Sequence, residues 1–81
     1  MELKDTIELM NSSDYKDRLK AEYYQAKIRY DKLYDMTVKY EANTLTFTPK
    51  CSLALLKEQK MYLGNYIRTL KVRAEIEGIE L

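Results

Sequence analysis

Apolar positions recur at helical spacing along most of the 81-residue chain. Within residues 13–40, intervals of four and three connect one set of positions: Leu19, Tyr23, Ala26, Tyr30, Leu33 and Thr37. A second set lies within residues 51–77: Leu56, Leu63, Ile67, Leu70 and Ala74. Side chains at these intervals share one face of an α-helix. The pattern therefore predicts two long helices of similar length, about 38 Å each at 1.5 Å per residue.

The segments outside the two long helices are short. Residues 1–11 place Leu3, Ile7 and Met10 on one face and predict a short N-terminal helix. The stretch "NSSD" at 11–14 follows, and either Ser12 or Ser13 is a suitable N-cap for the first long helix.

The remaining breaks in the pattern carry turn residues. Residues 41–50 form a loop, because threonines are poor helix formers and Pro49 biases Thr48 toward an extended backbone. Gly78 suits a left-handed helix end, and residues 78–81 form a tail. The chain is thus a single all-α domain, an antiparallel two-helix hairpin with a short N-terminal helix.

One hairpin cannot cover all the apolar surface of its helices. Leu53, Leu55, Tyr62 and Tyr66 lie off the packing face of the second long helix. Exposure on this scale is unusual for a monomer. We therefore expect the fold to be completed by homo-oligomerisation.

The charge of the chain is close to balanced, with a formal net charge of +1. Residues 57–73 nevertheless hold five lysines and arginines against Glu58 alone. This local excess is too small for a duplex nucleic-acid surface but could bind a few phosphates. Nucleic-acid binding is accordingly the weakest of the binding hypotheses.

The residues required for common catalytic and metal sites are missing. The chain has no histidine and a single cysteine, Cys51, and it carries no glycine-rich phosphate loop. We expect no enzyme activity, no catalytic residue, no metal and no cofactor. No window is apolar enough for a membrane span, and the acidic N-terminus lacks the features of a secretory signal.

The tyrosines divide between the packing face and other faces. Tyr15, Tyr24 and Tyr34 lie off the packing face, where a ring contacts a second subunit or serves as a stacking platform. Arg18 and Lys27 lie within about a turn of Tyr15 or Tyr24, as expected for a site that also binds phosphates.

Two further features have alternative interpretations. In an antiparallel hairpin Arg18 and Glu22 fall level with Arg73, so the three form either a polar network that fixes register or an anion pocket. Gly64, in the middle of a helix, predicts the close approach of another backbone, inside the hairpin or across a subunit interface.

Residues 14–76 resemble a family of small helical phage and prophage proteins, the crAss-phage-related group, for which no activity is established. The matching elements are Tyr–x–x–Arg–Leu–x–x–Glu at 15–22, Lys–Leu at 32–33 and Leu–Leu–x–x–Gln at 55–59, continued by Tyr66, Leu70 and Arg73. Ala26 departs from the pattern, which usually has a larger apolar residue there. The resemblance implies a phage origin and a host-cytoplasm setting. In architecture only, the chain also resembles phage sponge proteins that sequester cyclic nucleotide signals.

These observations lead to one main hypothesis. The chain is expected to be a phage anti-defence accessory protein that sequesters a nucleotide-derived immune signal as a homo-oligomer. Its ligand-binding residues would be Tyr15, Arg18, Tyr24, Lys27 and Arg73, in a pocket built between subunits. The alternative is a protein-binding inhibitor or adaptor that blocks a host defence factor through one helical face.

Overall fold

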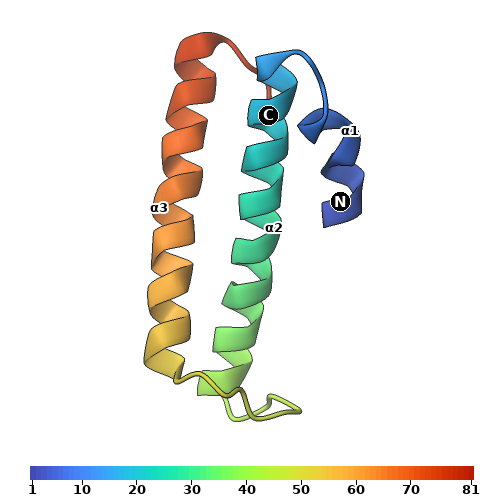
Figure 1. Ribbon diagram of the computed structural model, residues 1–81. Coiled ribbons are helices and arrows are strands. Elements are labelled where there is room, and N and C mark those ends of the chain that lie inside the picture. Colours follow the sequence, from blue (N-terminus) through green and yellow to red (C-terminus); the bar gives the residue numbers. More distant parts are fainter.

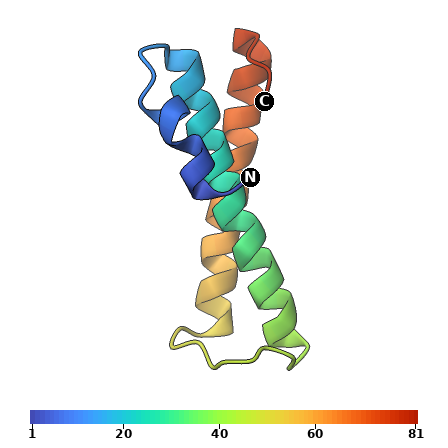
Figure 2. The same ribbon diagram turned by 90° about the vertical axis from the view of Figure 1, so that its right-hand side faces the viewer.

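The computed structural model describes residues 1–81 and contains helices only, which confirms the predicted all-α hairpin with a short N-terminal helix (Figure 1). A 3₁₀ turn, η1 (Leu3–Thr6), continues into α1 (Ile7–Met10). The two long helices are α2 (Tyr15–Glu41) and α3 (Leu53–Glu77). They run side by side along the 43 Å length of the molecule and cross at a small angle (Figure 2).

The start of α2 is set by Asp14 and not by Ser12 or Ser13 as predicted. The Asp14 carboxylate accepts a hydrogen bond from the Lys16 amide at 3.0 Å. The Ser12 hydroxyl accepts from the Asp14 amide at 3.1 Å and donates to Asp17 at 2.8 Å. Ser12 therefore orients the capping residue, and the helix begins two residues later than expected.

Both ends of α3 follow from its capping residues. Ser52 accepts a hydrogen bond from the Leu55 amide at 3.2 Å, so the helix begins at Leu53. Gly78 ends it in the left-handed conformation, with φ of 69°. The amide of Ile79 then donates to the Ala74 carbonyl at 2.8 Å, which is the Schellman arrangement.

The core lies between α2 and α3 in two clusters. Tyr23 and Ala26 of α2 pack against Ile67 and Leu70 of α3, with Tyr30 and Leu63 at the edge. Near the open end of the hairpin, Leu19 and Ala74 pack with Ile79 of the tail. Most buried positions of the two long helices belong to the two apolar stripes, so the packing faces are as predicted; Ala21 is buried as well, although it lies off the stripe.

The N-terminal segment packs on α2 and does not contact α3 (Figure 1). Its predicted apolar face is wrong, since Ile7 and Met10 are 50% and 47% exposed whereas Thr6 is fully buried. The cause is the initial 3₁₀ turn, which has three residues per turn and shifts the phase of the face. The Thr6 hydroxyl accepts a hydrogen bond from the Gln25 side-chain amide at 2.9 Å and donates to the Leu3 carbonyl at 2.7 Å.

The loop between the long helices is closed by an ion pair. Lys57 Nζ lies 2.5 Å from a carboxylate oxygen of Glu41, so the first turn of α3 is held against the last turn of α2. The neighbouring ammonium lowers the pKa of Glu41. Both side chains are exposed, so the ion pair contributes little to the free energy of unfolding. Its main effect is to align the two long helices.

Candidate functional site

A basic groove runs along one flank of the hairpin, where side chains of α2 and α3 meet. It has a volume of about 290 Å³. Two residues of α2 and four of α3 line it: Lys27, Tyr30, Gly64, Ile67, Arg68 and Lys71. The α3 residues come together because intervals of three, four and seven place them on one side of the helix.

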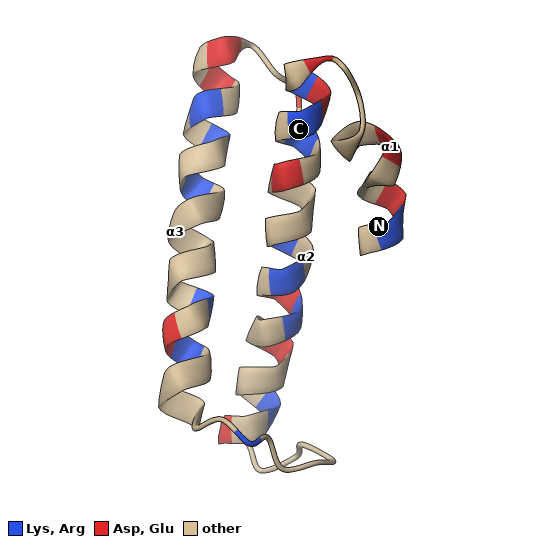
Figure 3. Ribbon diagram, viewed as in Figure 1, with Lys and Arg blue, Asp and Glu red and all other residues tan.

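The cations of the basic groove differ in their partners. Lys27 bonds to Asp31 one turn along α2, at 2.8 Å, and this carboxylate raises the pKa of the lysine. Arg68 and Lys71 have no carboxylate within ion-pair distance. Figure 3 shows the basic positions of α3 on either side of an uncharged middle. The groove therefore presents two uncompensated positive charges, which favours an anionic ligand.

Aromatic rings form one wall of the basic groove and continue along it. Tyr30 stacks with Tyr34 at a centroid distance of 6.3 Å and an interplanar angle of 28°. Lys60 Nζ lies 5.3 Å from the centroid of the Tyr34 ring. Further up, Lys71 Nζ lies 6.0 Å from the Tyr23 ring. Alternating rings and cations are the side chains that bind flat, phosphorylated molecules.

Gly64 makes room for one of these rings. A Cβ atom at this position would lie 3.1 Å from Cε2 of Tyr30, closer than ordinary van der Waals contact. Within the hairpin the neighbour of Gly64 is the Tyr30 side chain and not a second backbone, so that alternative of the prediction is wrong. Close approach across a subunit interface stays a prediction. The glycine lets Tyr30 lie against α3 and keeps the floor of the basic groove low.

The opposite flank holds a second groove, the Tyr66 groove, of about 400 Å³. Its lining is Glu22, Tyr66, Thr69, Leu70 and Arg73. The Tyr66 hydroxyl donates a hydrogen bond to the Glu22 carboxylate, which raises the pKa of Tyr66 to about 12. Here the positive and negative groups largely satisfy one another.

The predicted set of Arg18, Glu22 and Arg73 does not form a hydrogen-bonded network. Arg73 Nε bonds to Glu77 of its own helix at 3.1 Å. Arg18 donates to the Ser12 carbonyl at 2.8 Å and so fastens the turn before α2. Glu22 instead accepts from Tyr66, so a tyrosine supplies the link between the helices that we had expected from an arginine.

The five predicted ligand residues are distributed over different parts of one chain. Tyr15 and Tyr24 are nine residues apart, which places them on opposite sides of α2 at about 100° per residue. Tyr15 is 47% exposed, whereas Tyr24 is half-buried and packs edge-on against Tyr23 at 5.3 Å. Lys27 lies in the basic groove and Arg73 in the Tyr66 groove. A single protomer therefore does not gather them into one pocket.

The sequence reasoning missed Tyr30, Arg68 and Lys71 as candidate site residues. A signal was present, since Lys57, Gly64 and Lys71 are seven residues apart and Arg68 follows Gly64 by four. This spacing predicts one basic face along α3. The interpretation of Tyr30 as a packing residue is correct but incomplete, because its partly buried ring also lines the groove.

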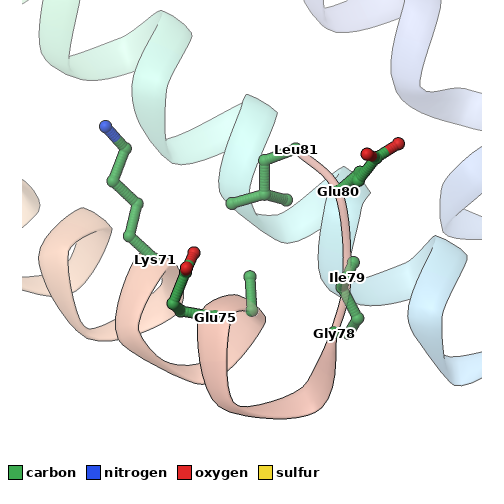
Figure 4. A pocket seen from close by; sticks show the side chains of 7 residues that line it. Lys71, Glu75, Gly78, Ile79, Glu80 and Leu81 are labelled. Atoms are coloured by element: carbon green, nitrogen blue, oxygen red, sulfur yellow. The ribbon is translucent and has the colours of Figure 1, made fainter.

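The largest hollow, of about 700 Å³, lies at the open end of the hairpin between α3 and the tail (Figure 4). Lys71 stands at its edge with Glu75, and Glu80 follows from the tail. Figure 4 shows the tail after Gly78 turning back toward α2. With two carboxylates against one lysine, this hollow is less suited to an anion than the basic groove.

No cluster of side chains in residues 1–81 has the composition of a metal site. None of the helices combines the length and the low polarity that a membrane crossing requires.

Comparison with known proteins identifies a family. Neither the curated proteins nor the solved structures give a match. The family model described as Sequestin matches residues 13–76, which span α2, the loop and nearly all of α3. The name of the family indicates sequestration of a ligand. The basic groove, the Tyr66 groove and the hairpin core all lie within the matched residues, and the chain belongs to the Sequestin family.

Proposed function

We propose that this protein is a phage anti-defence accessory protein. It binds a nucleotide-derived immune signalling molecule in the host cytoplasm and sequesters it without chemical conversion, as a homo-oligomer. Membership of the Sequestin family supports the sequestering role. The phage origin rests on the resemblance of residues 14–76 to small phage proteins.

The observation that carries the proposal is the composition of the basic groove. Arg68 and Lys71 are free of carboxylate partners, and they line one groove with Lys27 and with the Tyr30 ring, which packs against Gly64. In the proposed complex Arg68 and Lys71 bind phosphate oxygens, because charge-assisted hydrogen bonds to an anion are the strongest that side chains offer. The exposed ring surfaces of Tyr30 and Tyr34 stack against the base.

A second subunit completes the pocket in this proposal. Tyr15 and Arg18 lie away from the basic groove of their own chain. They reach a ligand there only from a neighbouring copy. The assembly thereby uses the ring of Tyr15, which a monomer leaves exposed.

Calorimetric titration with cyclic dinucleotides and with cyclic ADP-ribose isomers tests the proposal. We expect micromolar or tighter binding of at least one ligand, and a loss of ten-fold or more in affinity on Arg68→Ala or Lys71→Ala. Lys32→Ala is the matched control, since it removes one exposed positive charge outside the groove. Absence of heat for every ligand at micromolar concentrations would rule the proposal out.

The competing function is an inhibitor or adaptor that binds a host defence protein through a helical face. The observation in its favour is the exposed apolar surface of α3, which includes Tyr62 and Ile76 at 59% and 79% exposure. Native mass spectrometry of protein purified from host cells separates the two functions. A sponge retains a small molecule, whereas an adaptor retains a protein in stoichiometric amount.

A further inference from the structure

The side of α3 that faces away from α2 carries almost no charge. This outward face consists of residues at alternating intervals of three and four: Leu55, Glu58, Tyr62, Asn65, Thr69, Val72 and Ile76. All seven are exposed, and the N-terminal segment does not cover them because it packs on α2 alone. The lysines of α3 lie on the side of the helix that includes Gly64. Because consecutive residues point about 100° apart, this side is separate from the outward face, which includes Asn65.

The outward face has one charged member, Glu58, and the opposite charge of Arg73 stands at its border. Glu58 lies near the first turn of the face and Arg73 near its last, and both are exposed. Fifteen residues separate them, which is about 22 Å along a helix, so they cannot pair within one chain. Each lies equally far from the midpoint between Asn65 and Tyr66. Two copies of α3 packed antiparallel about that midpoint bring Glu58 of each copy beside Arg73 of the other.

The same midpoint brings further positions of the outward face opposite one another. Leu55 is then opposite Ile76 of the second copy, and Tyr62 is opposite Thr69. Asn65 lies at the centre, where a polar side chain facing its own copy fixes register. A surface that is complementary to itself about one axis is the requirement for a two-fold interface.

We infer that the outward face of α3 binds the outward face of a second copy, antiparallel and centred between Asn65 and Tyr66. The pairing of two hairpins in this way makes a four-helix assembly with Glu58–Arg73 contacts at both ends. Arg73 can take part while bonded to Glu77, because its guanidinium has five donors and only Nε is used. The basic groove stays open to solvent, since Gly64 and Arg68 lie off this face.

The inference rests on the part of the proposed function that makes the protein a homo-oligomer, and it is independent of the ligand. Sedimentation and native mass spectrometry of the full chain at tens of micromolar test it. We expect a complex with an even number of subunits. Glu58→Arg or Arg73→Glu alone places like charges opposite one another at both ends and weakens the dimer by ten-fold or more.

Combining the charge reversals gives the decisive result. The double variant E58R/R73E restores opposite charges in the homodimer. An equimolar mixture of the two single variants forms a heterodimer, because one chain then carries two arginines and the other two glutamates at these positions. Glu75→Arg, a reversal of an exposed charge outside the outward face, is the control and leaves the complex intact.

Two outcomes overturn the inference. One is a protein that is monomeric at these concentrations, including a monomer that binds a host protein on this face. The other is an oligomer that the single reversals leave unchanged, which places the contact elsewhere. Ligand titration of a variant that has become monomeric separates this inference from the proposed function, because loss of the dimer and absence of ligand binding are measured independently.

Discussion

The hydroxyl of Tyr66 on α3 donates a hydrogen bond to the carboxylate of Glu22 on α2, and this bond joins the middle of α3 to the first third of α2. The other direct polar link between them, Lys57 to Glu41, lies at the loop end of the hairpin. The Tyr66–Glu22 bond therefore fixes the register of the helices far from the loop.

Removal of this bond should have a measurable cost that depends on pH. We expect Tyr66→Phe to lower the free energy of unfolding by about 0.5–1 kcal/mol at neutral pH, since the pair is partly exposed. The pKa of Tyr66 is raised from 10 to about 12 in the folded protein. The contribution is therefore complete below pH 10 and is lost as the pH rises from 10 through 12.

Urea denaturation of both proteins between pH 6 and pH 12 measures this difference. The difference in the free energy of unfolding between wild type and Tyr66→Phe should be constant up to about pH 9 and should disappear as the pH rises above 10. A gap that stays open at pH 12 would contradict the assignment of the shift to Glu22. Tyr62→Phe is a control, because its hydroxyl bonds to Glu58 of the same helix and does not join the two helices.

Gly64 and Tyr30 should be coupled energetically. Gly64→Ala gains about 1 kcal/mol of helix propensity, but its Cβ displaces a ring atom from 3.1 Å, so the net change should stay within about 0.5 kcal/mol. In a Tyr30→Ala background the ring is absent, and Gly64→Ala should then give the full gain from helix propensity. A double-mutant cycle by thermal denaturation measures the coupling. Additivity of the two substitutions would contradict the steric role of the ring.

The tail should contribute to stability through Ile79 alone. Ile79 is 7% exposed and packs with Leu19 and Ala74, so Ile79→Ala should destabilise the protein by about 2 kcal/mol or more. Glu80→Ala should remain within about 0.5 kcal/mol, because Glu80 is exposed. Chemical denaturation gives both values. Equal effects of the two substitutions would show that the contact with Leu19 is not formed.

The basic groove should reduce the stability of the free protein. Arg68 and Lys71 are near Lys27 and lack acidic partners, so Lys71→Met relieves repulsion and should raise the free energy of unfolding slightly, by up to about 0.5 kcal/mol. The gain should shrink with added salt, which screens exposed charges. Melting temperatures at low and high sodium chloride test this. Lys32→Met, outside the groove, should show no such gain.

Much of the hairpin was predictable because its determinants are local. The stripe from Leu19 to Thr37 and the stripe from Leu56 to Ala74 give the helices and their packing faces. Gly78 ends α3 as expected, since a left-handed residue closes a helix through bonds within a single turn. Errors at this level are small: Asp14 replaces a serine as the cap of α2, because several residues of one stretch can serve equally well.

The site residues were less predictable. Tyr30 belongs to the packing stripe by its spacing, and only its position against Gly64 exposes one side of the ring to the basic groove. The polar partner of Glu22 was also misjudged, because Arg73 and Tyr66 are two turns apart on nearly the same side of α3. Helical spacing alone therefore does not show which of the two side chains bonds to Glu22.

The amino-acid sequence by itself determined the two long helices, the end of α3 at Gly78 and the side of each long helix that is buried. Hydrogen bonds and side-chain contacts at intervals of three and four produce these features, and they are present in the order of residues. The tertiary structure alone decided that Tyr66 meets Glu22, that Thr6 meets Gln25, and that Lys27 shares a groove with Arg68. Such pairs depend on the offset and crossing angle of separate helices, which packing between them sets.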